Sequence, residues 1–421
     1  MTLQKKHDRE RVAIVGMGFG GIRAARVLAG QGMEVILVDR NNYHLFQPLL
    51  YQVATAGLEQ EAIAYPVRAM ARNWPGVRFH LAEVLGVDFA TRTLRTATGP
   101  ISYDRLILGA GSVTNFFGLK SVEQHAFDLK ELADAEALRN HILTAFEKAS
   151  IEPDPARKRA LMTFVIVGGG PTGVEFAGAL AELVRFVLAK DYPELGTHAA
   201  RVVLVEATDQ LLASMPQKLR AYTLAKLRRM AVEVLLNARV VDAGPERVVL
   251  HDGAIIPAHT LFWSAGVKAA PLAERLGVPA AAAGRIAVAP DLTLPGHPEV
   301  YVVGDMAYLE QDGLPLPMTA PVAMQSGIYA ARSILAKTRG EALPPFRYRD
   351  KGNMATIGRN AAVASAFGLN FRGYAAWLVW LLLHLYYLIG FRNRIVVMLN
   401  WLWYYWFHER QVRLITNRTS S

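Results

Sequence analysis

The chain has 421 residues, which is enough for two or three domains that each bury a core. It contains no cysteine, and this excludes disulfide scaffolds, zinc ribbons, thiolate iron–sulfur clusters and thiol catalysis. The formal net charge is +10, but residues 1–340 hold no basic cluster interleaved with stacking aromatic residues, so we expect no nucleic acid partner. The first residues lack the apolar stretch of a secretory signal, so we expect the bulk of the protein to stay in the cytoplasm, and we predict no metal site.

A glycine fingerprint follows the first predicted strand. Apolar residues 12–15 are typical of a buried strand, and small and apolar residues follow at helical spacing over 22–28. Between them, Gly16 permits a tight turn, Gly18 lets the backbone approach a pyrophosphate, and Gly21 lets helix and strand pack closely. A phosphate can then bind the amides of the helix N-terminus, so the segment predicts a dinucleotide site.

An acidic residue and a small-residue turn extend this first site. Asp39 follows the next apolar strand, 18 residues after Gly21, where a carboxylate accepts hydrogen bonds from ribose hydroxyls. A further apolar strand, 105–108, ends in small residues up to Gly111, and such a turn suits close passage of the backbone beside a cofactor. The alternative interpretation of Asp39 is an exposed turn carboxylate.

A helical, acid-rich stretch at 128–149 and a polar linker lead to a second fingerprint. Gly168, Gly170 and Gly173 follow an apolar strand at 164–167 and precede a helical pattern. One fingerprint alone is weak evidence. Two fingerprints in the same strand, turn and helix setting indicate two bound dinucleotides.

Glu206 ends the strand after the second fingerprint, 33 residues past Gly173. This spacing is longer than usual, because residues 191–198 are typical of an extended loop between helix and strand. The charge of Glu206 would repel a 2′-phosphate, so we expect NADH rather than NADPH in this domain. An exposed turn carboxylate is again the alternative.

Two later strands repeat the small-residue ending. Strand 260–263 runs to Gly266, and a strand from residue 300 ends at Asp305 before a helical pattern at 321–335. These elements predict an α/β fold with two Rossmann-like dinucleotide-binding domains, one inserted into the other, and a C-terminal helical region that anchors the chain to a membrane. We place the first domain at 1–115 and 276–343, a helical linker at 116–160, the inserted domain at 161–275 and the C-terminal region at 344–421.

The C-terminal region changes character along its length. Residues 347–367 are typical of strands, whereas 373–391 are 19 residues without a formal charge, just long enough to span a bilayer, and 395–407 form a shorter apolar and aromatic run. Five arginines against one acid from residue 391 onward, together with tryptophan and tyrosine, suit a membrane interface with anionic headgroups. A buried helical hairpin is the alternative, and the sequence leaves open whether the segment spans the membrane or lies on it.

Two further segments are far more discriminating than the glycine fingerprints, which would fit many flavoproteins. They are Asn-Asn-Tyr-His-Leu-Phe-Gln-Pro-Leu-Leu-Tyr-Gln-Val-Ala-Thr-Ala-Gly at 41–57 and Tyr-Arg-Asp-Lys-Gly-Asn-Met-Ala-Thr-Ile-Gly-Arg at 348–359. On these segments, and over nearly its whole length, the chain resembles the type II NADH:quinone oxidoreductases, which do not pump protons. The resemblance also includes the runs at 168–175, 303–305, 320–325 and 389–394.

This resemblance implies FAD in the first domain, NADH in the inserted domain and a quinone as electron acceptor, at the cytoplasmic face of the cell membrane. Carried over by motif, the residues that bind FAD are Gly16, Gly18, Gly21, Asp39 and Asp305, and those that bind NADH are Gly168, Gly170, Gly173 and Glu206. Gln47, Gly111 and Gly266, which lie in turns that suit close approach to a cofactor, are further cofactor-binding candidates. A plain turn is the alternative role of Gln47. The quinone type, and whether the chain acts alone or as a homodimer, stay open.

The catalytic candidates follow from the needs of the two half-reactions. Hydride transfer from NADH to a flavin requires positioning more than acid or base, whereas quinone reduction takes up two protons and benefits from an ionisable group. Glu175, two residues past the second fingerprint, is the first candidate for this group, and a carboxylate that only complements the helix dipole is the alternative. Gln325 is the candidate for quinone binding, because Pro321 and Ser326 stand where the family often has glutamine. Lys351 either steadies the flavin or is merely exposed.

We therefore expect an NADH:quinone oxidoreductase that does not pump protons. Two other functions remain as alternatives: a reductase of a soluble carrier protein, and a membrane-associated FAD-binding scaffold. The apolar tail and the lack of a charged docking patch argue against the carrier. A scaffold would show only slow flavin reduction. A sulfide-oxidising quinone reductase would need the cysteines that this chain lacks.

Overall fold

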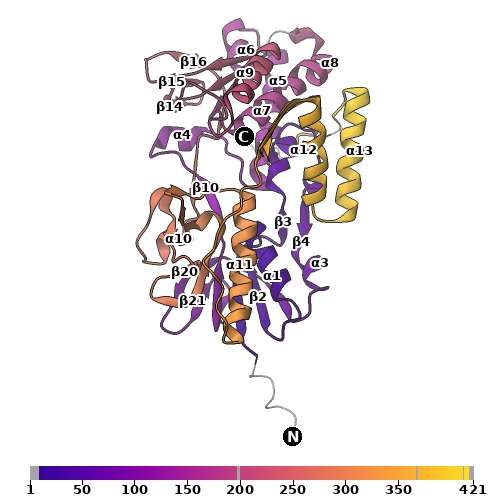
Figure 1. The fold of residues 1–421 in the computed structure, drawn as a ribbon. Coiled ribbons are helices and arrows are strands. Elements are labelled where there is room, and N and C mark those ends of the chain that lie inside the picture. The colour runs from indigo at the N-terminus through magenta and orange to yellow at the C-terminus, as the bar shows by residue number, and fades with distance from the viewer. Residues whose placement is uncertain (1–8, 197–199, 367, 411, 417–421) are drawn as a thin grey trace. The chain divides into compact units, whose positions relative to one another are not determined.

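The computed structural model describes residues 9–196, 200–366, 368–410 and 412–416, which divide into two compact units (Figure 1). The first unit takes the described residues of 1–44, 65–113 and 267–350, and the second takes those of 45–64, 114–266 and 351–421. Each unit is therefore built from three segments that are separated in the sequence. Four short strands lie where the chain changes unit: β3 (Tyr43–Leu45), β4 (Ala64–Pro66), β10 (Ser112–Thr114) and β18 (Val267–Ala269).

A six-stranded sheet forms the centre of the first unit, in the order β20-β21-β9-β1-β2-β5. All neighbours in this sheet run parallel except β20, which is antiparallel to β21. The parallel strands are continuous apolar runs because both faces of the sheet are covered, and Val12, Ala13 and Ile14 have no exposure to solvent. The strands are β1 (Arg11–Val15), β2 (Glu34–Asp39), β5 (Val77–Leu81), β9 (Arg105–Leu108), β20 (Thr293–Leu294) and β21 (His297–Val302).

Helices α1 (Phe19–Leu28) and α11 (Ala320–Thr338) of this unit pack closely at glycines. A Cβ at Gly20 would come within 3.1 Å of the Ala323 carbonyl oxygen, and one at Gly327 would overlap the backbone of Gly20. The unit also contains the short helices α3 (Val67–Ala71) and α10 (Leu272–Arg275). An antiparallel sheet is formed by β6 (Val84–Asp88), β7 (Thr93–Thr96) and β8 (Gly99–Ser102). Two further strand pairs are β19 (Ile286–Ala287) with β22 (Ala307–Tyr308), and β23 (Glu310–Gln311) with β24 (Leu314–Pro315).

The second unit is centred on a four-stranded parallel sheet in the order β13-β12-β11-β17. Every residue of the central strand β11 is buried. The sheet consists of β11 (Thr163–Val167), β12 (Arg201–Val205), β13 (Val232–Leu235) and β17 (Thr260–Trp263). The unit also contains an antiparallel sheet of β14 (Val240–Gly244), β15 (Arg247–Leu250) and β16 (Ile255–Pro257). The helices are α2 (Leu50–Ala54), α4 (Lys120–His125), α5 (Leu132–Ile151), α6 (Pro155–Leu161), α7 (Pro171–Glu182), α8 (Ala189–Asp191) and α9 (Gln217–Arg229).

The two central sheets share one topology. The strands β9-β1-β2-β5 of the first unit correspond in order to β17-β11-β12-β13 of the second. In both units the three strands of an antiparallel sheet directly precede, in the sequence, the strand that pairs with the first strand of the central sheet. Strands β6, β7 and β8 precede β9, and strands β14, β15 and β16 precede β17. The first strand of each sheet leads into a glycine fingerprint and a helix. The predicted α/β fold with two Rossmann-like domains is therefore confirmed, whereas an anchoring role for the C-terminal helices stays a prediction.

The expected helix at 128–149 begins later, at Leu132. Glu131 is the N-cap of α5, and its amide donates to Asp134 Oδ2 at 2.7 Å in a capping box. This reciprocal cap satisfies amides at the start of the helix, which sets its first turn after residue 131.

The C-terminal region forms an antiparallel sheet followed by two helices. The sheet contains β25 (Asn353–Gly358), β26 (Ala361–Ala366) and β27 (Leu369–Gly373), and α12 (Tyr374–Tyr387) and α13 (Phe391–Phe407) follow it. The prediction of strands from residue 347 was wrong for 347–352, which form no strand. Part of that segment is held by a side chain instead, since Tyr348 donates its amide to Gln311.

The apolar run 373–391 does not form one continuous helix. It divides between the end of β27, helix α12 and the start of α13, because the chain turns between the helices at Gly390, whose φ of +92° favours glycine. Among the described residues, we find no helix whose length and apolarity would let it cross a bilayer.

Candidate active site

The first glycine fingerprint lies at the carboxyl end of β1. Gly16 has a φ of +93°, and a Cβ at Gly21 would overlap the carbonyl oxygen of Gly16. A Cβ at Gly18, by contrast, would meet no protein atom within 4 Å. Two of the three positions thus exclude a side chain for reasons internal to the fold, and the third leaves a cradle at the N-terminus of α1 that suits a diphosphate.

Asp39, at the end of the neighbouring strand β2, closes the turn of this fingerprint. Its Oδ2 accepts from the Met17 amide at 2.6 Å, and its Oδ1 accepts from the Asn41 amide at 2.8 Å. Burial raises the pKa of Asp39, while these amides lower it. Each carboxylate oxygen can accept a second hydrogen bond, so the residue can support the loop and still bind a ribose hydroxyl.

Gly111 and Asp305 follow the next two strands at the same edge of the sheet, β9 and β21. Gly111 has a φ of +76°, and a Cβ there would meet nothing within 4 Å. Ser112 Oγ donates to Asp305 Oδ2 at 2.6 Å. Ser326, where glutamine was expected, accepts from the Gly304 amide at 3.0 Å and so holds the turn before Asp305. The predicted FAD residues of the first unit are therefore gathered at the carboxyl ends of its parallel strands, where α/β sheets bind ligands.

The second fingerprint repeats this geometry after β11. Gly168 has a φ of +109° and would bring a Cβ within 2.8 Å of Ala265, while a Cβ at Gly173 would overlap the Gly168 carbonyl oxygen. A Cβ at Gly170 would meet nothing within 4 Å. The space beside this glycine again adjoins a helix N-terminus, that of α7, whose first turn has no acidic side chain.

Glu206, at the end of β12, corresponds to Asp39 in both position and bonding. Its Oε2 accepts from the Gly169 amide at 2.6 Å, and its Oε1 accepts from the Thr208 amide at 2.8 Å. Gly266, after β17, lies against an aromatic ring, since a Cβ there would come within 2.7 Å of Phe117. The predicted NADH residues thus share one edge of the second sheet.

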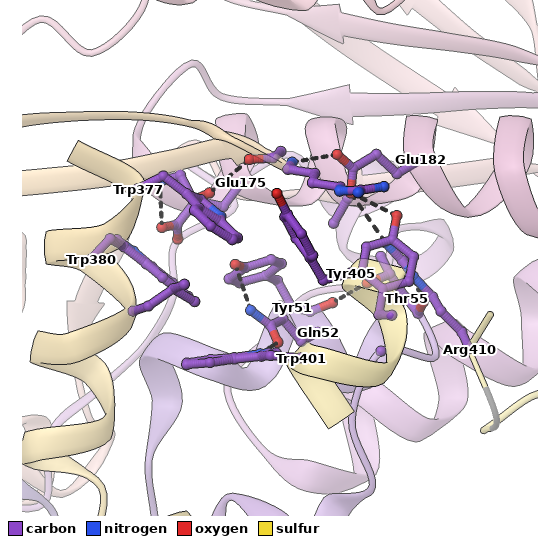
Figure 2. Close-up of a pocket in the computed structure, with 17 residues that line it drawn as sticks. Tyr51, Gln52, Thr55, Glu175, Glu182, Trp377, Trp380, Trp401, Tyr405 and Arg410 are labelled. Carbon is purple, nitrogen blue, oxygen red and sulfur yellow. Dashed lines mark hydrogen bonds and ion pairs between the residues drawn. The ribbon is translucent and has the colours of Figure 1, made fainter. Parts of the chain in front are cut away.

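A cavity in the second unit brings together side chains from α2, α7, β25, α12 and α13 (Figure 2). Six of its 17 lining residues are aromatic, so we call it the aromatic cavity. Two buried nitrogens on this wall, Nε of Arg359 and Nε of Arg410, have no hydrogen-bond partner among the described residues. Both are donors that cannot accept. The aromatic and charged side chains that line the cavity are Tyr51, Glu175, Glu182, Arg359, Trp377, Trp380, Trp401, Tyr404, Tyr405 and Arg410.

Glu175 is the predicted catalytic residue that lies in this cavity. Its Oε1 accepts from the Thr356 amide of β25 at 3.2 Å. Burial raises the pKa of Glu175 to about 8, although hydrogen bonds from the Thr356 amide and the Trp380 side chain lower it. At neutral pH the group is therefore mainly a neutral carboxylic acid, which can give up a proton and take one back.

A second carboxylate, Glu182, lies seven residues further along α7 and lines the same cavity. It pairs with Arg410 at 3.6 Å, and both side chains are at most 8% exposed. Tyr404 Oη donates to Glu182 Oε2 at 2.9 Å, and Arg410 donates to the Thr55 carbonyl at 2.6 Å. This buried network holds the segment after α13 against α7 and α2.

Three more of the predicted site residues, Gln325, Lys351 and Gln47, also lie outside this cavity. Gln325, in the first unit, donates to the Arg349 carbonyl at 2.9 Å and accepts from the Arg349 amide at 3.0 Å, so both ends of its amide are bound by backbone. Lys351 is exposed. Gln47 is exposed and donates to the Lys130 carbonyl at 3.0 Å.

Sequence analysis did not assign Tyr51, Gln52, Glu182 or Arg410. Tyr51 and Gln52 lie within the discriminating segment 41–57, which was recognised as a whole but not residue by residue. Glu182 follows Glu175 by seven residues, a spacing that places two side chains on one helix face and could have indicated it. Nothing near Arg410 in the sequence indicates that it is buried.

A profile of the pyridine nucleotide-disulphide oxidoreductase family matches residues 10–327. The type II NADH:quinone oxidoreductase Ndh of Mycobacterium tuberculosis is 41% identical over 93% of this chain and 87% of its own length. The chain belongs to the type II NADH:quinone oxidoreductases. The internal alternative NAD(P)H-ubiquinone oxidoreductase A1 of Solanum tuberosum is 31% identical over 94% of this chain and 87% of its own length. The solved structure of NDH2 from Plasmodium falciparum in complex with NADH has the same fold, with a TM-score of 0.88, 18% identity and coverage of 96% of this chain and 99% of that one. As a type II NADH:quinone oxidoreductase, the chain has FAD and NADH as its cofactors, and both glycine cradles fit a dinucleotide.

Proposed function

We propose that this protein oxidises NADH at the second fingerprint, holds FAD at the first, and reduces a quinone in the aromatic cavity of the second unit. The balanced reaction takes NADH, one proton and a quinone to NAD⁺ and a quinol. The observation that carries the quinone assignment is that the buried, protonated carboxyl group of Glu175 shares one cavity wall with aromatic side chains. A quinone offers only acceptors at its two carbonyl oxygens, on a flat ring that suits an aromatic wall.

The chain's own residues supply binding and a proton. Gly18 and Asp39 would hold the diphosphate and ribose of FAD, and Gly170 and Glu206 would hold those of NADH. FAD, when bound, supplies the chemistry that accepts two electrons as a hydride and passes them on. Glu175 holds a proton at its carboxyl oxygen within the cavity and is placed to deliver it to a quinone oxygen as negative charge develops there.

Steady-state and half-reaction kinetics test this proposal. With NADH, we expect rapid reduction of short-chain quinones, with the flavin reduced and reoxidised at rates that account for turnover. Ala179→Leu, which adds bulk inside the cavity between the two carboxylates of α7, should slow reoxidation by quinone and leave flavin reduction by NADH unchanged. Slow flavin reduction without quinone turnover would indicate a scaffold, and normal quinone turnover in Ala179→Leu would place the quinone elsewhere.

Glu206 is expected to set the preference for NADH. Glu206→Gln keeps an acceptor for the Gly169 amide but removes the charge that repels a 2′-phosphate. We expect the ratio of kcat/KM for NADPH to that for NADH to rise about tenfold, since ~1.4 kcal/mol corresponds to that factor. Measuring both ratios in parent and variant checks this, and an unchanged ratio would exclude Glu206 from the ribose site.

We also propose that α12 and α13 bind the cytoplasmic face of the cell membrane. Large apolar side chains on these helices face solvent, among them Leu382 at 68%, Tyr386 at 71%, Phe391 at 78% and Trp406 at 71% exposure. Arg392 is exposed beside Phe391 and has the charge that anionic headgroups attract. An exposed apolar patch of this kind, with aromatic and cationic residues, suits the headgroup region of a bilayer.

The combined variant Leu382→Ser, Tyr386→Ser and Trp406→Ser should lose binding to lipid vesicles. Fully burying such a side chain stabilises by roughly 1.5–3 kcal/mol, so removing three should weaken binding by about a thousandfold or more. Co-sedimentation with vesicles that contain anionic lipid measures the effect. Ile151→Ser, at a residue that is 82% exposed on α5, is the matched control and should bind like the parent. Unchanged sedimentation of the combined variant would exclude these helices as the membrane contact.

A further inference from the structure

Three side chains, Trp401 of α13 and Gln52 and Tyr51 of α2, form a hydrogen-bonded series whose direction is determined by its first member. The indole N–H of Trp401 can only donate, and it lies 2.8 Å from Oε1 of Gln52. The carbonyl oxygen of the Gln52 amide must therefore face Trp401. Because the amide is planar, its NH₂ group faces the opposite way, so its orientation follows from the chemistry of its neighbour.

The second bond of the series determines the role of the Tyr51 hydroxyl. Gln52 Nε2 lies 2.9 Å from Tyr51 Oη, and since an NH₂ group only donates, the phenol oxygen accepts. The hydroxyl proton of Tyr51 is then left to point away from Gln52. Within the described part of the chain, no acceptor for this proton lies within hydrogen-bond distance.

The free side of the Tyr51 hydroxyl belongs to the aromatic cavity. Tyr51 lines the cavity and is only 4% exposed. Figure 2 shows its hydroxyl on the side of Glu175 and Trp380. Burial raises the pKa of the Tyr51 phenol well above its usual value, and the nearby Glu175 raises it further, so the hydroxyl keeps its proton. Tyr51 therefore presents a neutral, buried donor to whatever occupies the cavity.

We propose that Tyr51 donates a hydrogen bond to a carbonyl oxygen of the bound quinone, and that Trp401 and Gln52 are positioning residues that keep the hydroxyl turned toward it. This inference rests on the proposed function, in which the quinone occupies this cavity. Tyr51 transfers neither proton nor electron in this role. It stabilises the negative charge that grows on the carbonyl oxygen during reduction, which lowers the barrier of the quinone step alone.

The first test removes only the hydroxyl, with Tyr51→Phe in the FAD-loaded enzyme. Losing one buried donor should lower the second-order rate of reoxidation by a short-chain quinone roughly ten- to a hundredfold. Reduction by NADH, and turnover with ferricyanide, which needs no carbonyl contact, should stay unchanged. Quenching of tryptophan fluorescence by quinone gives the Kd without turnover, and we expect weaker binding. Tyr192→Phe removes a tyrosine hydroxyl that donates to Glu147 outside the cavity, and it should behave like the parent.

The second test asks whether Gln52 and Trp401 act through Tyr51. Gln52→Leu and Trp401→Phe each break the series and should slow the quinone step in the parent. In a Tyr51→Phe background they should have no further effect, because the hydroxyl they orient is gone. Multiplying losses would overturn their role as positioning residues.

Ala179→Leu separates failure of this inference from failure of the proposed function. If Tyr51→Phe reacts with quinone at the parent rate while Ala179→Leu is slow, the hydrogen bond from Tyr51 is refuted and the cavity remains the quinone site. If both variants react at the parent rate, the quinone binds elsewhere, and both proposals fail together.

Discussion

Replacing Glu175 by glutamine is expected to slow the reoxidation of reduced enzyme by quinone by about a hundredfold or more, because a positioned general acid contributes roughly 10²–10⁴ in rate. Reduction by NADH should be unaffected. In the parent, the quinone step should also fall as pH rises through about 8, since the carboxyl then loses the proton it delivers. The variant should lack this inflection. Stopped-flow measurement of both half-reactions between pH 6 and pH 9.5 checks the expectation.

Glu147→Gln makes the same chemical change at an exposed residue of α5 and should leave both half-reactions and the pH profile as in the parent. Equal slowing of both half-reactions by Glu175→Gln would show that Glu175 supports the fold or a cofactor rather than the quinone step. An unchanged inflection near pH 8 would assign it to another group.

The raised pKa of Glu175 also affects stability. The ordinary value of 4.5 rises to about 8 on folding, so the folded chain binds this proton more tightly than the unfolded chain. The contribution of Glu175 to the free energy of unfolding therefore falls as pH rises from about 4.5 to 8. Glu175→Gln removes this dependence, so denaturant unfolding should show the variant gaining stability relative to the parent at pH 8 compared with pH 5.

Alanine substitutions at two glycines of the first fingerprint should distinguish a role in folding from a role in FAD binding. In Gly21→Ala the new Cβ overlaps the Gly16 carbonyl oxygen, so the backbone must move, and we expect loss of bound FAD together with a lower Tm. In Gly18→Ala the Cβ meets no protein atom within 4 Å, but it fills the space proposed for the diphosphate. We expect this variant to fold with the parent's Tm when both lack FAD, and to bind FAD much more weakly.

Flavin absorbance per polypeptide and thermal unfolding with and without added FAD measure both effects. The second fingerprint offers the same pair, because Gly173 is enclosed and Gly170 is open. Gly170→Ala should raise the KM for NADH without loss of FAD. Full FAD affinity in Gly18→Ala would refute the placement of the diphosphate at the N-terminus of α1.

Local patterns were sufficient to predict the two nucleotide domains. The apolar runs before Gly16 and Gly168 became central buried strands, and the helices begin within three residues of the second glycine. These features depend on residues close together in the chain, because a tight turn, an open cradle and a helix N-terminus all occur within one short segment. Asp39 and Glu206 were also placed correctly at their strand ends, although the sequence could not indicate that each also supports its glycine turn.

Only the tertiary structure decided how the C-terminal region contributes to the wall of the cavity. Apolar content predicted helices there, but the break at Gly390 and the direction of each face depend on packing against the rest of the unit. Gln325, singled out from its motif, has both amide ends bound by the backbone of Arg349, a contact between residues 24 positions apart.

The cavity itself joins residues from 51 to 410, and no local pattern could assemble it. Tyr51 and Trp401 are 350 positions apart and are linked only through Gln52, while Arg410 reaches Glu182 and Thr55 from a segment with no buried pattern of its own. The sequence by itself determined the two dinucleotide folds and their chemistry, because short-range sterics and hydrogen bonding define them. The cavity was decided by the tertiary structure, because its side chains come together only when segments distant in the sequence bury one another.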